Sequence, residues 1–293
     1  MYRQRGHDCA GRDGLLAPSR SRSARLSAAQ SLGGRHMVAR AKKSLGQHFL
    51  VDGGVIEQIL GAVPAQPEPI LEIGPGRGAL TERLREQQRP LVLVEKDADL
   101  ATQWRARGIE TLEADAADPA WLDALPDRQF TVVSNLPYNA ATAIVRVLLS
   151  RWPRFPVMVL MFQREVAQRF SEAGSRLGGP LGVLAALVYR VRTVLDVPPG
   201  AFSPPPKVQS RVLRFDVRED AAPPEDLDPA WRLLLQLFQR RRARLDRALA
   251  NAVGRSRGEV QAWFRECGLR EDARPDHLSP EQFRVLFHRS RAA

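Results

Sequence analysis

The chain has 293 residues, 44% of them hydrophobic, which is enough apolar material for one full core and a smaller second one. No apolar run approaches the roughly 20 residues of a membrane span, and Cys9 and Cys267 offer neither a disulfide framework nor a metal-ligand spacing, so we expect a soluble, cytoplasmic protein without a membrane partner. The net charge of +11 indicates either a GC-rich genome that favours arginine or attraction to a polyanion such as a nucleic acid.

Residues 1–36 are rich in arginine and serine and have little periodic apolar pattern. We expect them to be a disordered or non-native N-terminal extension, because Met37 and the residues after it look like a more natural start. An organelle transit peptide has a similar composition, but Asp8, Asp13 and the lack of an amphipathic stretch argue against one.

A helical spacing of apolar residues runs from about 52 to 62, and strand and helix patterns then alternate. Apolar runs typical of buried strands occupy 70–73, 91–94, 109–112, 130–133 and 157–162, and helical patterns between them occupy 79–87, 97–105 and 140–150. Short apolar strands separated by helices indicate a parallel sheet of the α/β class. Two later strands, 191–197 and 212–217, are predicted to form a terminal hairpin on that sheet.

The acidic and proline-rich segment 219–229 is typical of a linker. Beyond it, a strongly periodic helix is predicted over 231–250, with further helical patterns near 259–267 and 280–288. The sequence therefore predicts an α/β domain over 37–218 and a small all-helical C-terminal domain over 219–293.

The first strand ends in a glycine-rich turn that contains Gly74, Gly76 and Gly78. Such a turn lets backbone approach a ligand, although a tight turn without a ligand, or a dinucleotide site, would show the same spacing. Glu95 ends the next strand, where a carboxylate can accept both hydroxyls of a ribose, and Asp115 follows the third strand, where it can accept from an adenine amino group. Either acid alone is typical of a solvated loop, but together they predict an adenosine pocket.

The fourth predicted strand stops at Ser134-Asn135-Leu136-Pro137-Tyr138. If the Asn135 side chain and the Leu136 carbonyl both accept from one exocyclic amino group, its delocalised lone pair is freed for attack. Tyr138 can stack on the base. A strand that simply ends at a proline, with a capping asparagine, is the structural alternative.

At this point the sequence resembles known families. Residues 72–76, Glu95, Asp115 and 135–138 resemble the ordered motifs of S-adenosylmethionine-dependent adenine-N6 methyltransferases. Four more stretches are similar to the ribosomal small-subunit RNA adenine dimethyltransferase family: KSLGQHFL at 43–50, FQREVA at 162–167, VPPGAFSPPPKV at 197–208 and FQRRR at 238–242. The resemblance covers roughly residues 38 to 290 and both predicted domains.

The resemblance implies a Rossmann-like class I fold and an enzyme of ribosome biogenesis. It would transfer methyl groups to N6 of two adjacent adenosines in the hairpin near the 3′ end of small-subunit (16S) rRNA. The implied methyl donor is S-adenosylmethionine without a metal, the implied partners are 16S rRNA and the small ribosomal subunit, and we expect a monomer.

The resemblance also implies roles for single residues. His48 and Leu50 would line the cofactor site, Gly74 and its neighbour Gly76 would lie near the methionine part, and Glu95 and Asp115 would hold ribose and adenine. Asn135 would lie between cofactor and target base, with Leu136 beside it. Phe202 would face Tyr138 across an adenine flipped out of its stack.

Three positions depart from the family pattern: His48 stands where many members have asparagine, residues 178–183 lack an expected arginine and a helix-start serine, and Asp246 replaces a polar uncharged residue. The basic run Arg240, Arg241, Arg242, Arg244 and Arg247 is predicted to bind rRNA phosphates, with Lys42, Lys43 and Lys207 adding charge near the catalytic face. A solvated helix face is the alternative for this run.

Two other functions compete with this hypothesis. The N-x-P-Y turn suits any planar amino group, so DNA adenine, large-subunit rRNA or protein glutamine are alternative acceptors; the P-P-P-K loop and the arginine run argue against them. An assembly or transcription factor that keeps the fold and the RNA surface without the chemistry is the non-enzymatic alternative. The intact glycine turn, both acids and the N-L-P-Y turn argue against that one.

Overall fold

The computed structural model describes residues 48–67, 69–173, 175 and 178–292. The expected N-terminal extension over 1–36, Lys42, Lys43 and all but the last three residues of the 43–50 stretch lie outside these residues. Within the described part of the chain, no helix is long and apolar enough to cross a membrane.

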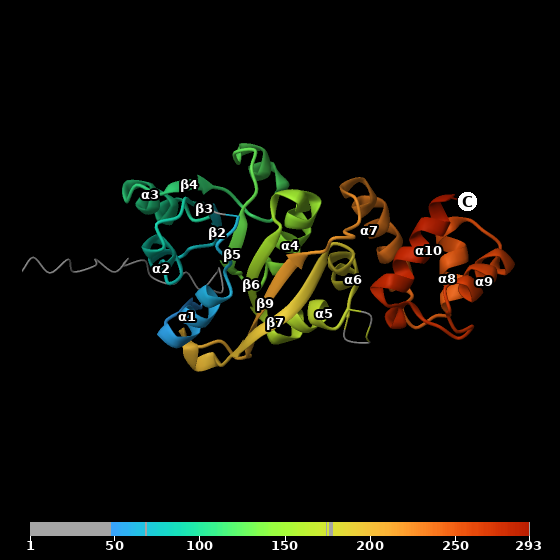
Figure 1. Cartoon of the computed structure of the whole chain (residues 1–293). Coiled ribbons are helices and arrows are strands. Elements are labelled where there is room, and N and C mark those ends of the chain that lie inside the picture. Colours follow the sequence, from blue (N-terminus) through green and yellow to red (C-terminus); the bar gives the residue numbers. More distant parts are fainter. Residues whose placement is uncertain (1–47, 68, 174, 176–177, 293) are drawn as a thin grey trace, which may run out of the picture. The chain divides into compact units, whose positions relative to one another are not determined.

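A seven-stranded sheet forms the centre of the fold, with the strand order β4-β3-β2-β5-β6-β9-β7 (Figure 1). Its strands are β2 (Ile70–Ile73), β3 (Leu91–Glu95), β4 (Glu110–Glu113), β5 (Thr131–Asn135), β6 (Val157–Gln163), β7 (Tyr189–Val197) and β9 (Ser210–Val217). The first five are parallel to one another, whereas β9 is antiparallel to β6 and β7 is antiparallel to β9. The predicted parallel sheet and its terminal hairpin are therefore confirmed.

Helices connect the strands and cover both faces of the sheet. They are α1 (Gly53–Gly61), α2 (Thr81–Glu86), α3 (Ala98–Ala106), α4 (Ala141–Ser150), α5 (Arg164–Ser171) and α6 (Pro180–Ala186), with short 3-10 turns at Pro119–Ala124, Trp152–Arg154 and Pro199–Ala201. Two begin at a capping aspartate: Asp52 accepts from Val55 N, and Asp97 accepts from Asp99 N and Leu100 N. The inner strands β2, β3, β5 and β6 are buried on both faces, and their side chains divide between two large core clusters.

The C-terminal helices are α7 (Pro224–Gln239), α8 (Leu245–Val253), α9 (Arg257–Glu266) and α10 (Pro280–Ala292), with a 3-10 turn at Pro275–His277. The predicted linker over 219–229 is wrong in its second half, because α7 begins at Pro224, where a missing N–H costs nothing, and continues through Pro229. One core cluster runs from the sheet into these helices. The domain boundary at 218/219 stays a prediction.

The single helix predicted over 231–250 is also wrong, because a turn at 240–244 separates α7 from α8. Arginines three and four residues apart repel each other on a helix surface. Four arginines among these five residues therefore favour the break.

A second, two-stranded sheet joins distant parts of the chain: β1 (Phe49–Leu50) pairs antiparallel with β8 (Phe202–Ser203). The backbone of Val51 continues the contact by donating to the Ala201 carbonyl at 2.8 Å. The N-terminal segment is thereby fixed beside the P-P-P-K loop.

Gly182 explains part of the departure over residues 178–183. A Cβ at this buried position of α6 would lie 1.8 Å from the Arg169 carbonyl oxygen of α5, so the two helices approach more closely than a serine would allow. The expected serine is absent, but α6 can begin at Pro180, because a proline at the first helical position lacks only an N–H that would have no partner within the helix.

We expect Gly182→Ala to lower the free energy of unfolding by about 1–3 kcal/mol, because backbone must move to relieve the overlap. The matched control is Gly258→Ala in α9, where a Cβ meets nothing within 4 Å and better helix propensity should stabilise by up to about 1 kcal/mol. Urea unfolding of both variants measures the difference. Equal effects of the two changes would contradict this account of Gly182.

Candidate active site

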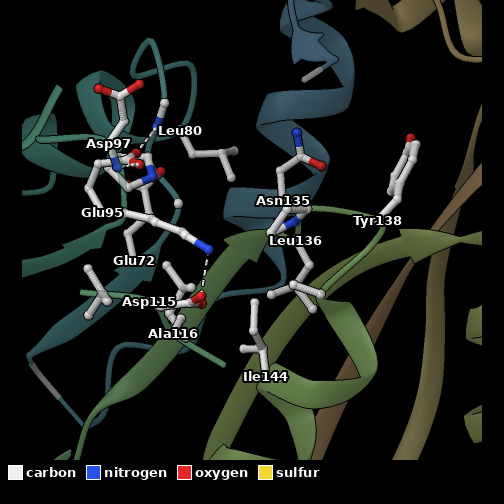
Figure 2. Close-up of a pocket in the computed structure, with 18 of the residues that line it drawn as sticks. Glu72, Leu80, Glu95, Asp97, Asp115, Ala116, Asn135, Leu136, Tyr138 and Ile144 are labelled. Carbon is white, nitrogen blue, oxygen red and sulfur yellow. Dashed lines mark hydrogen bonds and ion pairs between the residues drawn. The ribbon is translucent and has the colours of Figure 1, made fainter. Parts of the chain in front are cut away.

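A cavity opens at the carboxyl edge of the parallel strands. Its lining includes His48, Leu50, Glu72, Gly74, Gly76, Lys96, Glu95, Asp115, Asn135, Leu136 and Tyr138. Figure 2 shows the acids from neighbouring strands on one side and Asn135 and Tyr138 on the other. The structure thus brings together every predicted cofactor-site residue and three of the four residues expected to address the target base.

The glycine turn after β2 needs its glycines for two reasons. Gly74, Gly76 and Gly78 have φ of +65°, +53° and +90°, where other residues are strained. A Cβ on Gly78 would also lie 2.4 Å from the ring of Trp104, whose indole N–H donates to the Gly76 carbonyl at 3.2 Å. Trp104 therefore supports the turn from α3. In the sequence, Trp104 was one apolar residue of the helical pattern over 97–105, and no motif singled it out.

Glu95 braces the same turn from the end of β3. Its Oε2 accepts from Gly76 N at 3.1 Å and its Oε1 accepts from Asp97 N at 2.9 Å. Burial raises the pKa of this carboxyl, while the backbone hydrogen bonds act in the opposite direction. Since each carboxylate oxygen can accept more than one hydrogen bond, Glu95 can support the turn and still accept from a ligand hydroxyl.

Asp115 is held as an ionised acceptor in the cavity wall. Its Oδ2 accepts from Lys96 Nζ at 2.6 Å (Figure 2) and its Oδ1 accepts from Ala117 N at 3.0 Å. The hydrogen bond from Lys96 is the main reason why the pKa of Asp115 is lowered. Sequence reasoning missed Lys96, although its place directly after Glu95 puts it at this edge of the sheet.

Glu72 is a third carboxyl in the cavity wall, and sequence reasoning gave it no separate role. Its side chain is 2% exposed, and its Oε2 has no hydrogen-bond partner among the described residues. Burial raises its pKa from 4.5 to about 8. An unsatisfied polar atom next to a glycine turn fits a ligand that brings hydrogen-bond donors or positive charge, as S-adenosylmethionine does.

The pKa of Glu72 predicts a pH dependence of stability. Because the folded state keeps a proton that the unfolded chain releases, this group lowers the free energy of unfolding as pH rises from about 4.5 to about 8. Gln cannot titrate, so in cofactor-free protein Glu72→Gln should remove this decline and raise the melting temperature more at pH 8 than at pH 5. Thermal unfolding across this range checks it, with Glu110→Gln on exposed β4 as control. Parallel profiles for wild type and Glu72→Gln would contradict the prediction.

The N-L-P-Y turn leaves β5 at the centre of the cavity. Ser134 Oγ donates to the Ile73 carbonyl at 2.6 Å, which ties the end of β5 to β2, and Leu136 N donates to the Met161 carbonyl at 3.3 Å. The Tyr138 hydroxyl bonds Ser210 Oγ at 2.6 Å, so its ring is anchored from β9. The turn is thus fixed on both sides.

Phe202 lies elsewhere. Its side chain is 3% exposed, packs with the core cluster that contains Leu50 and Val197, and is not among the residues that line the cavity. The ring next to Tyr138 is His48, with ring centroids 5.7 Å apart. His48 Nδ1 donates to the Pro204 carbonyl at 2.8 Å, since a carbonyl can only accept. Stacking of Phe202 on a target base stays a prediction, and this structure does not form the sandwich with Tyr138.

The residues predicted to bind RNA are exposed. Lys207 lies in the P-P-P-K loop, while Arg240, Arg241 and Arg242 form the turn between α7 and α8 rather than a helix face. None of these four side chains has an ion pair or hydrogen bond within the part of the chain that the structure describes. Their binding role stays a prediction.

The mostly parallel sheet, with this cavity at its carboxyl edge, is that of a Rossmann-like class I S-adenosylmethionine-dependent methyltransferase. Residues 38–291 match the family model described as ribosomal RNA adenine dimethylase. The chain belongs to this family, as its motifs predicted.

Named relatives agree with the family. The chain is 38% identical to ribosomal RNA small subunit methyltransferase A of Bdellovibrio bacteriovorus, over 84% of this chain and 91% of the relative. It is 39% identical to the protein of the same name from Syntrophotalea carbinolica, over 84% and 96%.

Two solved structures have the same fold. The 23S rRNA methyltransferase ErmE is 27% identical, with a TM-score of 0.65 over 82% of this chain and 98% of that one. A dimethyladenosine transferase from Plasmodium falciparum is 22% identical, with a TM-score of 0.66 over 83% and 98%; at this identity the likeness shows the fold alone.

Proposed function

We propose that the chain dimethylates N6 of two adjacent adenosines in the 3′-terminal hairpin of 16S rRNA, with S-adenosylmethionine as methyl donor. One observation carries the proposal: the N-L-P-Y turn opens into the same cavity as the glycine turn and the acids at the ends of β3 and β4. One cavity can therefore hold both an adenosine cofactor and a planar amino group that accepts the methyl group. The names of the relatives support the small-subunit substrate.

The cavity fits the cofactor residue by residue. Gly74 and Gly76 leave room for backbone to contact its methionine part, Glu95 accepts from the ribose hydroxyls and ionised Asp115 accepts from the adenine amino group. Leu50 of β1 and His48, directly before β1, line the same cavity. When bound, S-adenosylmethionine supplies a methyl group activated by its positively charged sulfonium.

The N-L-P-Y turn prepares the nucleophile. Asn135 Oδ1 and the Leu136 carbonyl accept from the N6 amino group, which draws the nitrogen toward tetrahedral geometry and frees its lone pair. Tyr138, held by Ser210, stacks on the flipped base. Positioning therefore supplies most of the catalysis, and we propose that the reaction needs no metal. We further propose a cytoplasmic monomer with an RNA-binding C-terminal domain over 219–293.

Methylation of large-subunit rRNA is the second candidate, because ErmE shares the fold over 98% of its length. Its identity of 27% is lower than the 38–39% of the small-subunit relatives. Labelled S-adenosylmethionine, incubated with immature small subunits, large-subunit rRNA or naked DNA, separates the candidates when N6,N6-dimethyladenosine is mapped. We expect label in the 3′-terminal hairpin of 16S rRNA. Label in large-subunit rRNA alone would support the second candidate, and label in no substrate would support a binding protein without catalysis.

Asn135→Ala should lower the rate of methyl transfer by about 100-fold or more, because a hydrogen-bond acceptor used mainly in the transition state is removed. Cofactor should still bind, since the glycine turn and both acids are untouched. Single-turnover rates and calorimetric titration with S-adenosylmethionine measure the two effects. Retained turnover would refute the role that we give to Asn135.

Replacing Arg241 and Arg242 with alanine should weaken RNA binding and lower the slope of log affinity against log salt by about 0.7–0.9 for each lost phosphate contact. Cofactor affinity should not change. The control is Arg85→Ala, since Arg85 already pairs with Glu82 on α2. Fluorescence anisotropy with a labelled RNA hairpin checks the prediction, and unchanged RNA affinity of the double variant would overturn it.

A further inference from the structure

Asp246 is a buried charge in the first turn of α8. Its side chain is 0% exposed and it accepts hydrogen bonds from four residues. Arg244 NH2 lies 3.1 Å from Oδ2, Arg257 Nε 2.7 Å from Oδ2, Gln261 Nε2 3.1 Å from Oδ2, and Arg247 N 2.7 Å from Oδ1. Burial opposes ionisation, but these hydrogen bonds outweigh it and lower the pKa of Asp246 to about 2.

This carboxylate holds two arginines from different elements side by side. Arg244 ends the turn after α7 and Arg257 begins α9, yet both donate to the same oxygen of Asp246. Arg244 is fixed further by the Glu271 carbonyl, which accepts from its NH2 at 2.9 Å. The two guanidinium groups are therefore held next to each other in a defined orientation. Two arginine side chains without such a partner would lose conformational entropy on adopting the same arrangement.

Both arginines keep hydrogen-bond donors for a ligand. Their side chains are 48% and 52% exposed. A guanidinium has five N–H donors, and toward the described residues Arg257 commits only its Nε, which leaves both terminal nitrogens. Asp246 neutralises one of the two positive charges, so the pair of arginines retains a net positive charge at its exposed edge.

The surroundings of the pair favour a polyanion over a single small anion. Arg240, Arg241, Arg242 and Arg247 adjoin it in the chain, are exposed and have no side-chain ion pair among the described residues. The nearby Asp272 is engaged by Arg270 at 2.8 Å. Several exposed arginines that adjoin a fixed pair in the chain favour a ligand with several phosphates, such as a nucleic-acid backbone.

We propose that Arg244 and Arg257, aligned by Asp246, bind one phosphate of the RNA backbone, and that Asp246 is the positioning residue of this site. The inference rests on the proposed function for the identity of the RNA. It adds Arg257 to the predicted RNA surface, gives Arg244 of the basic run a fixed partner there, and gives a role to the departure at Asp246.

Arg257→Gln in the full chain should weaken binding of a labelled 3′-terminal hairpin several-fold and lower the salt slope by about one. Arg257→Lys, which keeps the charge but not the planar fork, should recover little of the lost affinity. The matched control is Arg255→Gln, since Arg255 pairs with Glu259 near the start of the same helix. Equal losses in Arg255→Gln and Arg257→Gln would overturn the proposal, because only net charge would then matter.

Asp246→Asn tests the positioning role by the sign of its effect. The change removes one negative charge and so raises the net charge by one, which by itself would tighten RNA binding. Loss of the alignment of Arg244 and Arg257 would instead weaken it. We expect weaker binding with unchanged affinity for S-adenosylmethionine; tighter or unchanged RNA binding would overturn the positioning role. Thermal unfolding shows whether the variant folds, and if it does not, the comparison of Arg257→Gln, Arg257→Lys and Arg255→Gln decides alone.

Mapping of methyl groups in wild type keeps this inference separate from the proposed function. If wild type methylates the hairpin but Arg257→Gln binds it normally, only the phosphate site fails. If wild type methylates none of the substrates, the proposed function fails, and the binding series still reports whether the arginine pair contacts RNA phosphate.

Discussion

The parallel alignment of β2 to β5 is the constraint on which the site depends. Because these strands run in the same direction, their carboxyl ends meet at one edge, and a glycine turn, Glu95 and the N-L-P-Y turn reach one cavity from separate parts of the chain. The hydrogen bond from Gly76 N to Glu95 Oε2 then locks the first turn to the second strand. The positions of the residues proposed to hold cofactor and acceptor are consequently set by the register of the sheet.

Three carboxyls around one cavity behave differently because their surroundings differ. Glu72 is buried without a partner for one oxygen and its pKa is raised to about 8, Glu95 is buried but accepts from backbone, and Asp115 is half-buried and paired with Lys96. Only Asp115 has a lowered pKa. A positive charge bound beside Glu72 and Glu95 would stabilise their ionised forms. The unpartnered Oε2 of Glu72 is the atom that can accept a hydrogen bond from a ligand.

The sequence predicted the strands of the sheet and its binding edge because short apolar runs and turn motifs are local signals. It did not predict Trp104 under the glycine turn or Lys96 on Asp115, since both act through contacts between elements that no local pattern encodes. The proline-rich start of α7 resembled a linker because proline at a helix N-terminus has the same local signature as a break. The turn at 240–244 was missed because the apolar stripe continues on both sides of it.

The pairing of β1 with β8 links the two halves of the proposed reaction. Leu50 lines the cofactor side of the cavity and pairs with Phe202, while His48 reaches the Pro204 carbonyl of the P-P-P-K loop and lies beside Tyr138. Because β1 and β8 have only two residues each, this link rests on few backbone hydrogen bonds, among them the one from Val51 N to the Ala201 carbonyl. The small sheet thus joins the N-terminal wall of the cavity to the P-P-P-K loop, whereas Asn135 is carried by β5 in the seven-stranded sheet.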